Sequence, residues 1–153
     1  MEAVTNLYQV SEIELVYKSK IKASQRPKIA SAKDAYNVFI KNWNENNIDF
    51  IEEFKIILLN QGNRVLGIYQ VSKGGLTGTI ADTRLVFAAA LKANAVAMIL
   101  AHNHPSGQLI ASHADKSLTR NIKAAGELLD IHVLDHLILT SEGFISFVEE
   151  GLM

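Results

Sequence analysis

The stretch Ala95-Val96-Ala97-Met98-Ile99-Leu100-Ala101, with His102-Asn103-His104-Pro105-Ser106-Gly107 directly after it, decides the fold predicted for this chain. An uninterrupted apolar run of this length is typical of a strand that is buried on both faces of a sheet. The two histidines then fall where the strand ends and a loop opens. Because binding sites in α/β folds lie at the ends of strands, we expect His102 and His104 to belong to a site.

Composition predicts a single domain, residues 1–153. The chain has 153 residues, of which 48% are hydrophobic, and this is enough for one core without cross-links. It has no cysteine, which excludes disulfides and thiolate chemistry, so any metal must be held by nitrogen and oxygen ligands. Lys and Arg (15) nearly balance Asp and Glu (16), which excludes a large basic field for nucleic acid or an anionic membrane and leaves only a local patch.

No targeting signal is recognisable in the sequence. The N-terminus lacks the basic, apolar and small-residue regions of a signal peptide, and no apolar run approaches the roughly 20 residues of a membrane-spanning helix. We therefore expect a cytoplasmic protein with no membrane partner. No internal repeat, low-complexity tract or interdomain linker is evident.

The spacing of apolar residues predicts strands and helices that alternate along the chain. We expect strands over residues 13–18, 53–59, 65–71, 95–101, 132–139 and 144–147, and helices over residues 31–43, 84–93 and 112–129. The second and third strands form a hairpin around Asn60-Gln61-Gly62-Asn63. This order predicts an α/β fold with a mixed β-sheet flanked by helices.

Helical spacing also predicts which faces are buried. In the first helix, capped by Ser31, these are Ala35, Val38, Phe39 and Trp43. In the second, capped by Asp82 or Thr83, they are Leu85, Ala88, Ala89 and Leu91. In the third, opened by Ser112, they are Leu118, Ile122, Ala125 and Leu129.

The residues around the site suggest a divalent metal. Side chains two apart on an extended segment point to the same side, so His102 and His104 can converge on one ion. Asp115 lies in the first turn of the next helix, and the short loop with Gly107 can fold that turn back over the histidines. A hydrolytic zinc ion takes three such ligands and leaves a fourth position for water. The alternative is that the histidines are ordinary loop residues and that Ser112-x-x-Asp115 only caps a helix.

The combined pattern, His102-x-His104, seven residues, then Ser112-x-x-Asp115, resembles the motif of the JAMM (MPN-plus) zinc metalloproteases. The stretch from His102 to Gly107 is similar to the bacterial RadC-like branch of that family. The similarity continues upstream through Arg84 and the Ala-rich helix, and downstream through the segments 134–136 and 146–151. It covers roughly residues 30–153. The N-terminal helix-hairpin-helix part of longer RadC-like proteins is not evident.

The resemblance implies a fold akin to the cytidine-deaminase sandwich and a Zn²⁺ ion bound by His102, His104 and Asp115, with water as the fourth ligand. It also implies an upstream glutamate that holds this water, placed at Glu52 by the apolar pattern of the following strand. Glu53 competes for this role, but adjacent strand residues face opposite sides, so only one of the two can reach the metal. The alternative is that both are solvated carboxylates at the strand end, and this is what we expect of Glu53.

Ser112 resembles the family serine that hydrogen-bonds the developing oxyanion, a duty that competes with helix capping. Ala111 departs from the family, where proline often precedes this serine. We expect His113 to be an exposed histidine of the first helical turn. His136 with Asp135 either supports the metal site from behind or forms a structural pair near a strand.

These observations favour a zinc-dependent metallohydrolase acting on peptide or isopeptide bonds. A DNA-repair-associated RadC-like accessory protein without essential protease activity is the alternative, although the near-neutral charge predicts weak, salt-sensitive DNA binding at most. A nucleobase deaminase is disfavoured because those enzymes use cysteine ligands. A binding module that has lost catalysis is disfavoured because every ligand is retained. The substrate and the oligomeric state stay open.

Overall fold

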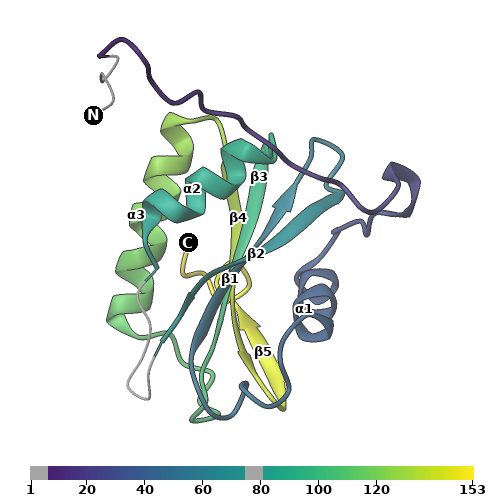
Figure 1. The fold of residues 1–153 in the computed structure, drawn as a ribbon. Coiled ribbons are helices and arrows are strands. Elements are labelled where there is room, and N and C mark those ends of the chain that lie inside the picture. The colour runs from purple at the N-terminus through teal and green to yellow at the C-terminus, as the bar shows by residue number, and fades with distance from the viewer. Residues whose placement is uncertain (1–6, 75–80) are drawn as a thin grey trace.

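The computed structural model describes residues 7–74 and 81–153 as one five-stranded mixed sheet with helices on both faces (Figure 1). The strands lie in the order β2-β1-β3-β4-β5. Helix α1 covers one face, and α2 and α3 cover the other (Figure 1). The bounds are η1 (Ala23–Gln25), α1 (Ala32–Lys41), β1 (Glu53–Leu59), β2 (Val65–Lys73), α2 (Thr83–Lys92), β3 (Ala97–Asn103), α3 (His113–Leu128), β4 (His132–Thr140) and β5 (Gly143–Ser146). The predicted α/β class with a mixed, helix-flanked sheet is confirmed.

Strand β3 is the centre of the sheet. It pairs antiparallel with β1 and parallel with β4, while β2 and β5 add antiparallel hairpin partners at the two edges. Phe54 of β1 lies opposite His102 of β3, so the start of β1 meets the end of β3. The predicted hairpin over residues 53–71 and the closing strand pair are therefore confirmed.

Alternation along β3 supplies a core to each face of the sheet. Met98 and Leu100 pack towards α2 and α3, whereas Ile99 and Ala101 pack towards α1. All seven residues of β3 are buried because helices cover both faces of the sheet. The strand begins and ends two residues later than the 95–101 predicted from apolarity, and His102 and Asn103 thus lie inside it. Polar side chains continue a buried strand here because each has a hydrogen-bond partner.

Helix starts follow the predicted caps. Ser31 accepts from the backbone N–H of Asp34, and Asp82 accepts from that of Arg84. Ser112 and Asp115 form a reciprocal capping box at the start of α3. Of the two candidates for the second cap, the structure selects Asp82.

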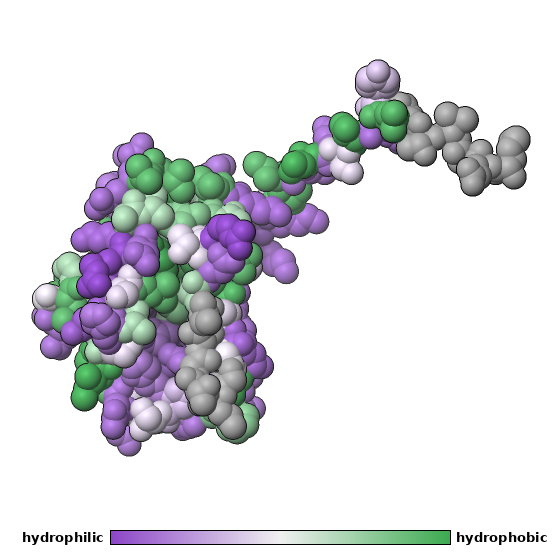
Figure 2. Space-filling view, turned by 90° about the vertical axis from the view of Figure 1, so that its left-hand side faces the viewer, coloured by the Kyte–Doolittle hydropathy of each residue, from purple (hydrophilic) through white to green (hydrophobic). Residues whose placement is uncertain are grey.

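The strand predicted over residues 13–18 is wrong. This segment runs extended along the surface without strand pairing, and the hydroxyl of Tyr17 donates to the carbonyl of Leu66. Figure 2 shows apolar side chains along the described part of the N-terminal segment, which projects from the body. Leu7, Tyr8, Val10, Ile13 and Leu15 are among its exposed residues. β-propensity measures fit to a half-buried sheet surface, and these residues have no such surface beside them.

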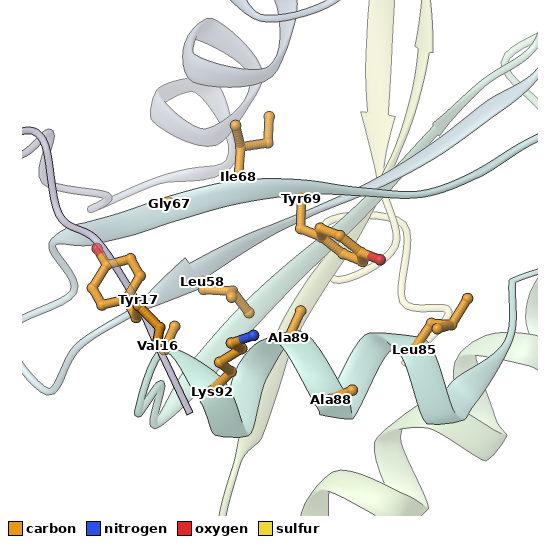
Figure 3. A pocket seen from close by; sticks show the side chains of 11 residues that line it. Val16, Tyr17, Leu58, Gly67, Ile68, Tyr69, Leu85, Ala88, Ala89 and Lys92 are labelled. Atoms are coloured by element: carbon orange, nitrogen blue, oxygen red, sulfur yellow. The ribbon is translucent and has the colours of Figure 1, made fainter. Parts of the chain in front are cut away.

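The buried face predicted for α2 is wrong except at Ala89, which is partly buried and packs against the core. Val86, Phe87 and Ala90 enter the core, whereas Leu85 and Leu91 are 44% and 52% exposed. Leu85, Ala88 and Ala89 instead line an apolar groove of about 390 Å³ between α2 and β2, where Val16 and Tyr17 of the N-terminal segment also lie (Figure 3). In α3, Ile122 is buried and Leu118 and Ala125 pack against the core as predicted, but Leu129 is largely exposed. Among the described residues, no helix has the length and apolarity needed to cross a membrane.

Candidate metal centre

Four side chains from three separate parts of the chain converge at one end of the sheet. Each of Glu52, His102, His104 and Asp115 offers a ligand atom, and these atoms lie within 4.8 Å of one another. Glu52 precedes β1, the histidines come from the end of β3 and the residue after it, and Asp115 lies in the first turn of α3. The antiparallel pairing of β1 with β3 brings the first two parts together.

The distances between three of these groups are close to those between ligands of a zinc ion, with each histidine facing a different oxygen of Asp115. Bonds of about 2.0–2.1 Å to nitrogen and oxygen give a tetrahedron whose edges are roughly 3.3–3.4 Å. Asp115 Oδ1 lies 3.3 Å from His102 Nε2, and Asp115 Oδ2 lies 3.3 Å from His104 Nε2. The two Nε2 atoms are 2.9 Å apart, a slightly short edge. Glu52 Oε1 stands farther off, 3.8 Å from His102 Nε2, and so is suited to face a ligand of the metal.

His104 presents its lone pair towards this point. Its Nδ1 lies 2.8 Å from the carbonyl oxygen of Gln108, which can only accept. In the neutral ring Nδ1 therefore carries the proton, which leaves Nε2 with the lone pair that a metal needs. Burial lowers the pKa of His104, but hydrogen bonds to Asp115 and Gln108 and the charge of Glu52 outweigh it and raise the pKa above its usual value.

Asp115 is held in place by the helix that it helps to start. Its Oδ2 accepts the backbone N–H of Ser112 at 2.9 Å. Burial raises the pKa of this carboxyl, but the neighbouring imidazoles of His102 and His104 and the hydrogen bond from the Ser112 backbone outweigh burial and hold the pKa well below its usual range. The group is thus an anionic, oriented oxygen donor.

Ser112 lies beside Asp115 as the N-cap of α3. Its Oγ accepts the backbone N–H of Asp115 at 3.0 Å, which uses a lone pair of the oxygen and leaves the hydroxyl proton free to be donated. Capping and oxyanion stabilisation are therefore chemically compatible. His113 is exposed, as predicted, and stands outside the cluster.

The two candidate glutamates face opposite sides. Glu52 joins the histidines, whereas Glu53 lies on the face covered by the connection from α1 to β1. The expectation of a solvated carboxylate is wrong for Glu53, which is 2% exposed. The Asn47 side chain donates to its Oε1 at 3.0 Å, and Lys55 Nζ lies 4.0 Å from its Oε2.

Asn103, the middle residue of the His-x-His pair, was not predicted to contribute to the site. It is fully buried, and its Oδ1 accepts the backbone N–H of Glu53 at 2.7 Å. Its Nδ2 donates to the carbonyls of Ile48 and Ile51, both at 2.8 Å. This amide ties the end of β3 to the backbone on both sides of Glu52. The sequence signal for this role was the two-residue period of a β-strand, because a residue between two ligands points to the opposite face of the sheet.

Of the two predicted alternatives, His136 fits support of the metal site and Asp135 fits a structural role. The His136 ring approaches the centre, with its Nε2 2.7 Å from His102 Nδ1 and its Nδ1 2.6 Å from Thr119 Oγ1. Asp135 turns away from that ring. It accepts from the His136 backbone N–H, the Ser146 hydroxyl and the Val148 N–H, and so fixes the turn after β5. Thr119 carried no sequence signal, because only the docking of α3 on β4 reveals its partner.

Comparison with known proteins gives one family. The model of the RadC-like JAB domain matches residues 29–152. A UPF0758 protein of Flavobacterium johnsoniae is 49% identical over 82% of this chain and 53% of its own length. Others from Symbiobacterium thermophilum and Clostridium beijerinckii are 46% and 36% identical, over 67% and 82% of this chain and 44% and 54% of their own lengths. The chain thus spans about half the length of the curated relatives it matches.

Proposed function

The chain belongs to the RadC-like JAB domain family, and from this premise we propose that it is a zinc-dependent metallohydrolase that cleaves peptide or isopeptide bonds. One observation carries the proposal. The carboxylate of Glu52 stands 3.8 Å from a nitrogen of His102, and His102 belongs to a set of three further donor side chains whose neighbouring atoms lie 2.9–3.3 Å apart. A purely structural zinc site has no need for such a carboxylate.

The residues divide the work of amide hydrolysis between them. When bound, zinc supplies a nucleophile at neutral pH by acidifying its water and polarises the scissile carbonyl. Glu52 takes the proton of the attacking water and delivers it to the nitrogen of the leaving amine. Ser112 donates its hydroxyl proton to the developing oxyanion, a contribution of about 3 kcal/mol in comparable sites.

The donor set also supports zinc hydrolysis over base deamination, the other chemistry of this type of fold. Zinc deaminases hold the ion with cysteines, and this chain has none. Two imidazoles and a carboxylate are instead the ligand types of hydrolytic zinc sites.

The test combines metal analysis with hydrolysis of a panel of fluorogenic peptide and isopeptide substrates. We expect one zinc per wild-type chain and its loss in His104→Ala. Glu52→Gln should keep the zinc but lose at least about 100-fold in turnover, because the proton acceptor is gone. Glu53→Gln is the matched control and should retain both. A wild-type chain without stoichiometric zinc, or a Glu52→Gln variant as active as wild type, would overturn the proposal.

A further inference from the structure

A row of buried polar side chains continues from the metal centre into the core. His102, His136 and Thr119 are 1%, 0% and 2% exposed, and they come from β3, β4 and α3. Their polar atoms are 2.7 and 2.6 Å apart in succession. Because each atom in such a row is either a donor or an acceptor, fixing the proton at one end fixes it at the other.

The end of the row that can be assigned without ambiguity is Thr119. Its Oγ1 lies 2.8 Å from the backbone carbonyl oxygen of Asp115. A carbonyl only accepts, so the hydroxyl proton points to Asp115. The hydroxyl has no second proton, and towards His136 it must accept. His136 Nδ1 is therefore an N–H donor.

The next link is the other nitrogen of His136. The ring lies between aromatic side chains, with the Phe147 ring centroid 4.5 Å away and that of Phe54 5.5 Å away. The adjacent carboxylate of Asp135 is bonded to Ser146 and to backbone N–H groups instead of the ring. The ring is fully buried, and its hydrogen-bond partners are the hydroxyl of Thr119 and the imidazole of His102, neither of which is a carboxylate that would stabilise a cation, so the neutral form is favoured. A neutral ring with its proton on Nδ1 offers a lone pair at Nε2.

The final link reaches the candidate metal ligand. Since His136 Nε2 accepts, His102 must donate to it through Nδ1 across 2.7 Å. The unprotonated nitrogen of His102 is then Nε2, the atom that faces Asp115 Oδ1 and His104 Nε2.

We propose that Thr119 and His136 are positioning residues that lock His102 in the tautomer able to bind the metal. This inference rests on the proposed zinc site. The row of hydrogen bonds also returns to the site, because the carbonyl that accepts the Thr119 proton belongs to Asp115, a second candidate ligand. Ligands from β3 and α3 are thereby linked through the core as well as through the ion, an arrangement that orients ligands before the metal arrives.

Two measurements test the proposal. Nitrogen-15 NMR of the histidine rings reads the tautomer of His102 directly in the metal-free protein. Competition with a chromophoric chelator gives the zinc dissociation constant. The variants are Thr119→Val, which removes the hydroxyl at nearly constant volume, and Thr119→Ser, which retains it. Ser146→Ala is the control, because it removes another buried hydroxyl bond away from the centre.

We expect the Nδ1–H tautomer of His102 in wild type and a mixture of tautomers in Thr119→Val, with zinc binding weakened about 10- to 100-fold. Thr119→Ser should restore both, and Ser146→Ala should leave the zinc dissociation constant unchanged. Wild-type zinc affinity in Thr119→Val, or an Nε2–H tautomer of His102 in the wild-type protein, would overturn the proposal. If wild type binds no zinc, the proposed function fails, and the NMR result still decides whether the row fixes the tautomer.

Discussion

Asp115 and His104 form a charged pair whose protonation favours the metal-free state. The imidazoles of His102 and His104 hold the pKa of the Asp115 carboxyl low despite its burial, and Asp115 in turn helps to raise the pKa of the His104 imidazole. A metal must displace the His104 proton, whereas the carboxylate is already ionised near neutral pH. Loss of the His104 proton is therefore part of the cost of binding the metal.

This arrangement predicts the pH dependence of zinc affinity. As the pH falls through the raised pKa of His104, protons compete with zinc, so affinity should fall from a higher pH than an ordinary histidine, near 6.5, would cause. Asp115 should add no further loss until strongly acidic pH. Chelator competition between pH 8 and 5.5 checks this. A zinc affinity that stays level down to pH 6 would contradict it.

At Gly126, substitution by alanine has two opposite effects on stability, a gain in helix propensity and a steric clash. Replacement of a helical glycine by alanine gains about 1 kcal/mol in helix propensity. A Cβ at this position would lie 2.4 Å from the carbonyl oxygen of Ile131, a backbone atom that cannot move alone. The resulting overpacking costs typically 1–3 kcal/mol. We expect Gly126→Ala to destabilise the protein by about 1–2 kcal/mol in urea unfolding, with the clash outweighing propensity.

The control for this prediction is Asn121→Ala at an exposed position of the same helix. It should be neutral or stabilise slightly, because only propensity changes there. A gain of stability in Gly126→Ala would show that the end of α3 relaxes away from β4.

At the scale of elements, Asn103 joins β3 to the segment that carries Glu52. Its amide satisfies one backbone donor and two backbone acceptors in the interior. Asn103→Ala leaves these groups without a partner, and each buried unsatisfied group costs about 1–3 kcal/mol. We expect a loss of about 2–4 kcal/mol in thermal or urea unfolding. The hydrolysis rate should fall more than the zinc affinity, because Glu52 loses its support while the histidines keep theirs.

Asn42→Ala is a suitable comparison, since this asparagine also donates to a backbone carbonyl but at an exposed position. Its effect should stay within about 0.5 kcal/mol. Equal stability losses for the two variants would mean that Asn103 does not hold the segment.

The helices also show when apolar periodicity predicts the buried face and when it does not. Helix α1 has a mixed polar and apolar sequence, so its spacing identified Ala35, Phe39 and Trp43 correctly as buried. Helix α2 is apolar at every position from Leu85 to Leu91, and a continuous run does not select a face. Val86, Phe87 and Ala90 enter the core, whereas Leu85, Ala88 and Ala89 of the predicted face line the groove.

For the candidate site too, local sequence patterns predicted some of the residues and missed others. The histidines and Asp115 follow from local spacing, and the choice of Glu52 over Glu53 rested on family resemblance. Thr119 and the contact of His136 with His102 depend on how α3 docks on β4 and on the parallel register of β3 with β4. Such contacts between distant segments leave no local pattern in one sequence.

For the whole molecule, the centre is a potential cross-link. It gathers groups from the start of β1, the end of β3 and the first turn of α3, so a bound ion would connect two neighbouring strands with the helix layer on one face. A ligand that binds only the folded state stabilises that state by mass action. Metal binding should therefore be visible in unfolding, independently of any substrate.

Removal of the metal should lower the melting temperature of the wild-type protein. Free zinc at 100 times its dissociation constant contributes about 2.7 kcal/mol, and at about 2–4 °C per kcal/mol for a chain of this size the shift is roughly 5–11 °C. Differential scanning fluorimetry with added zinc and with excess chelator measures it. His104→Ala should melt at the same temperature in both conditions, because the effect of zinc requires the complete ligand set. A wild-type melting temperature that does not respond to zinc would mean that the four side chains converge without binding the ion.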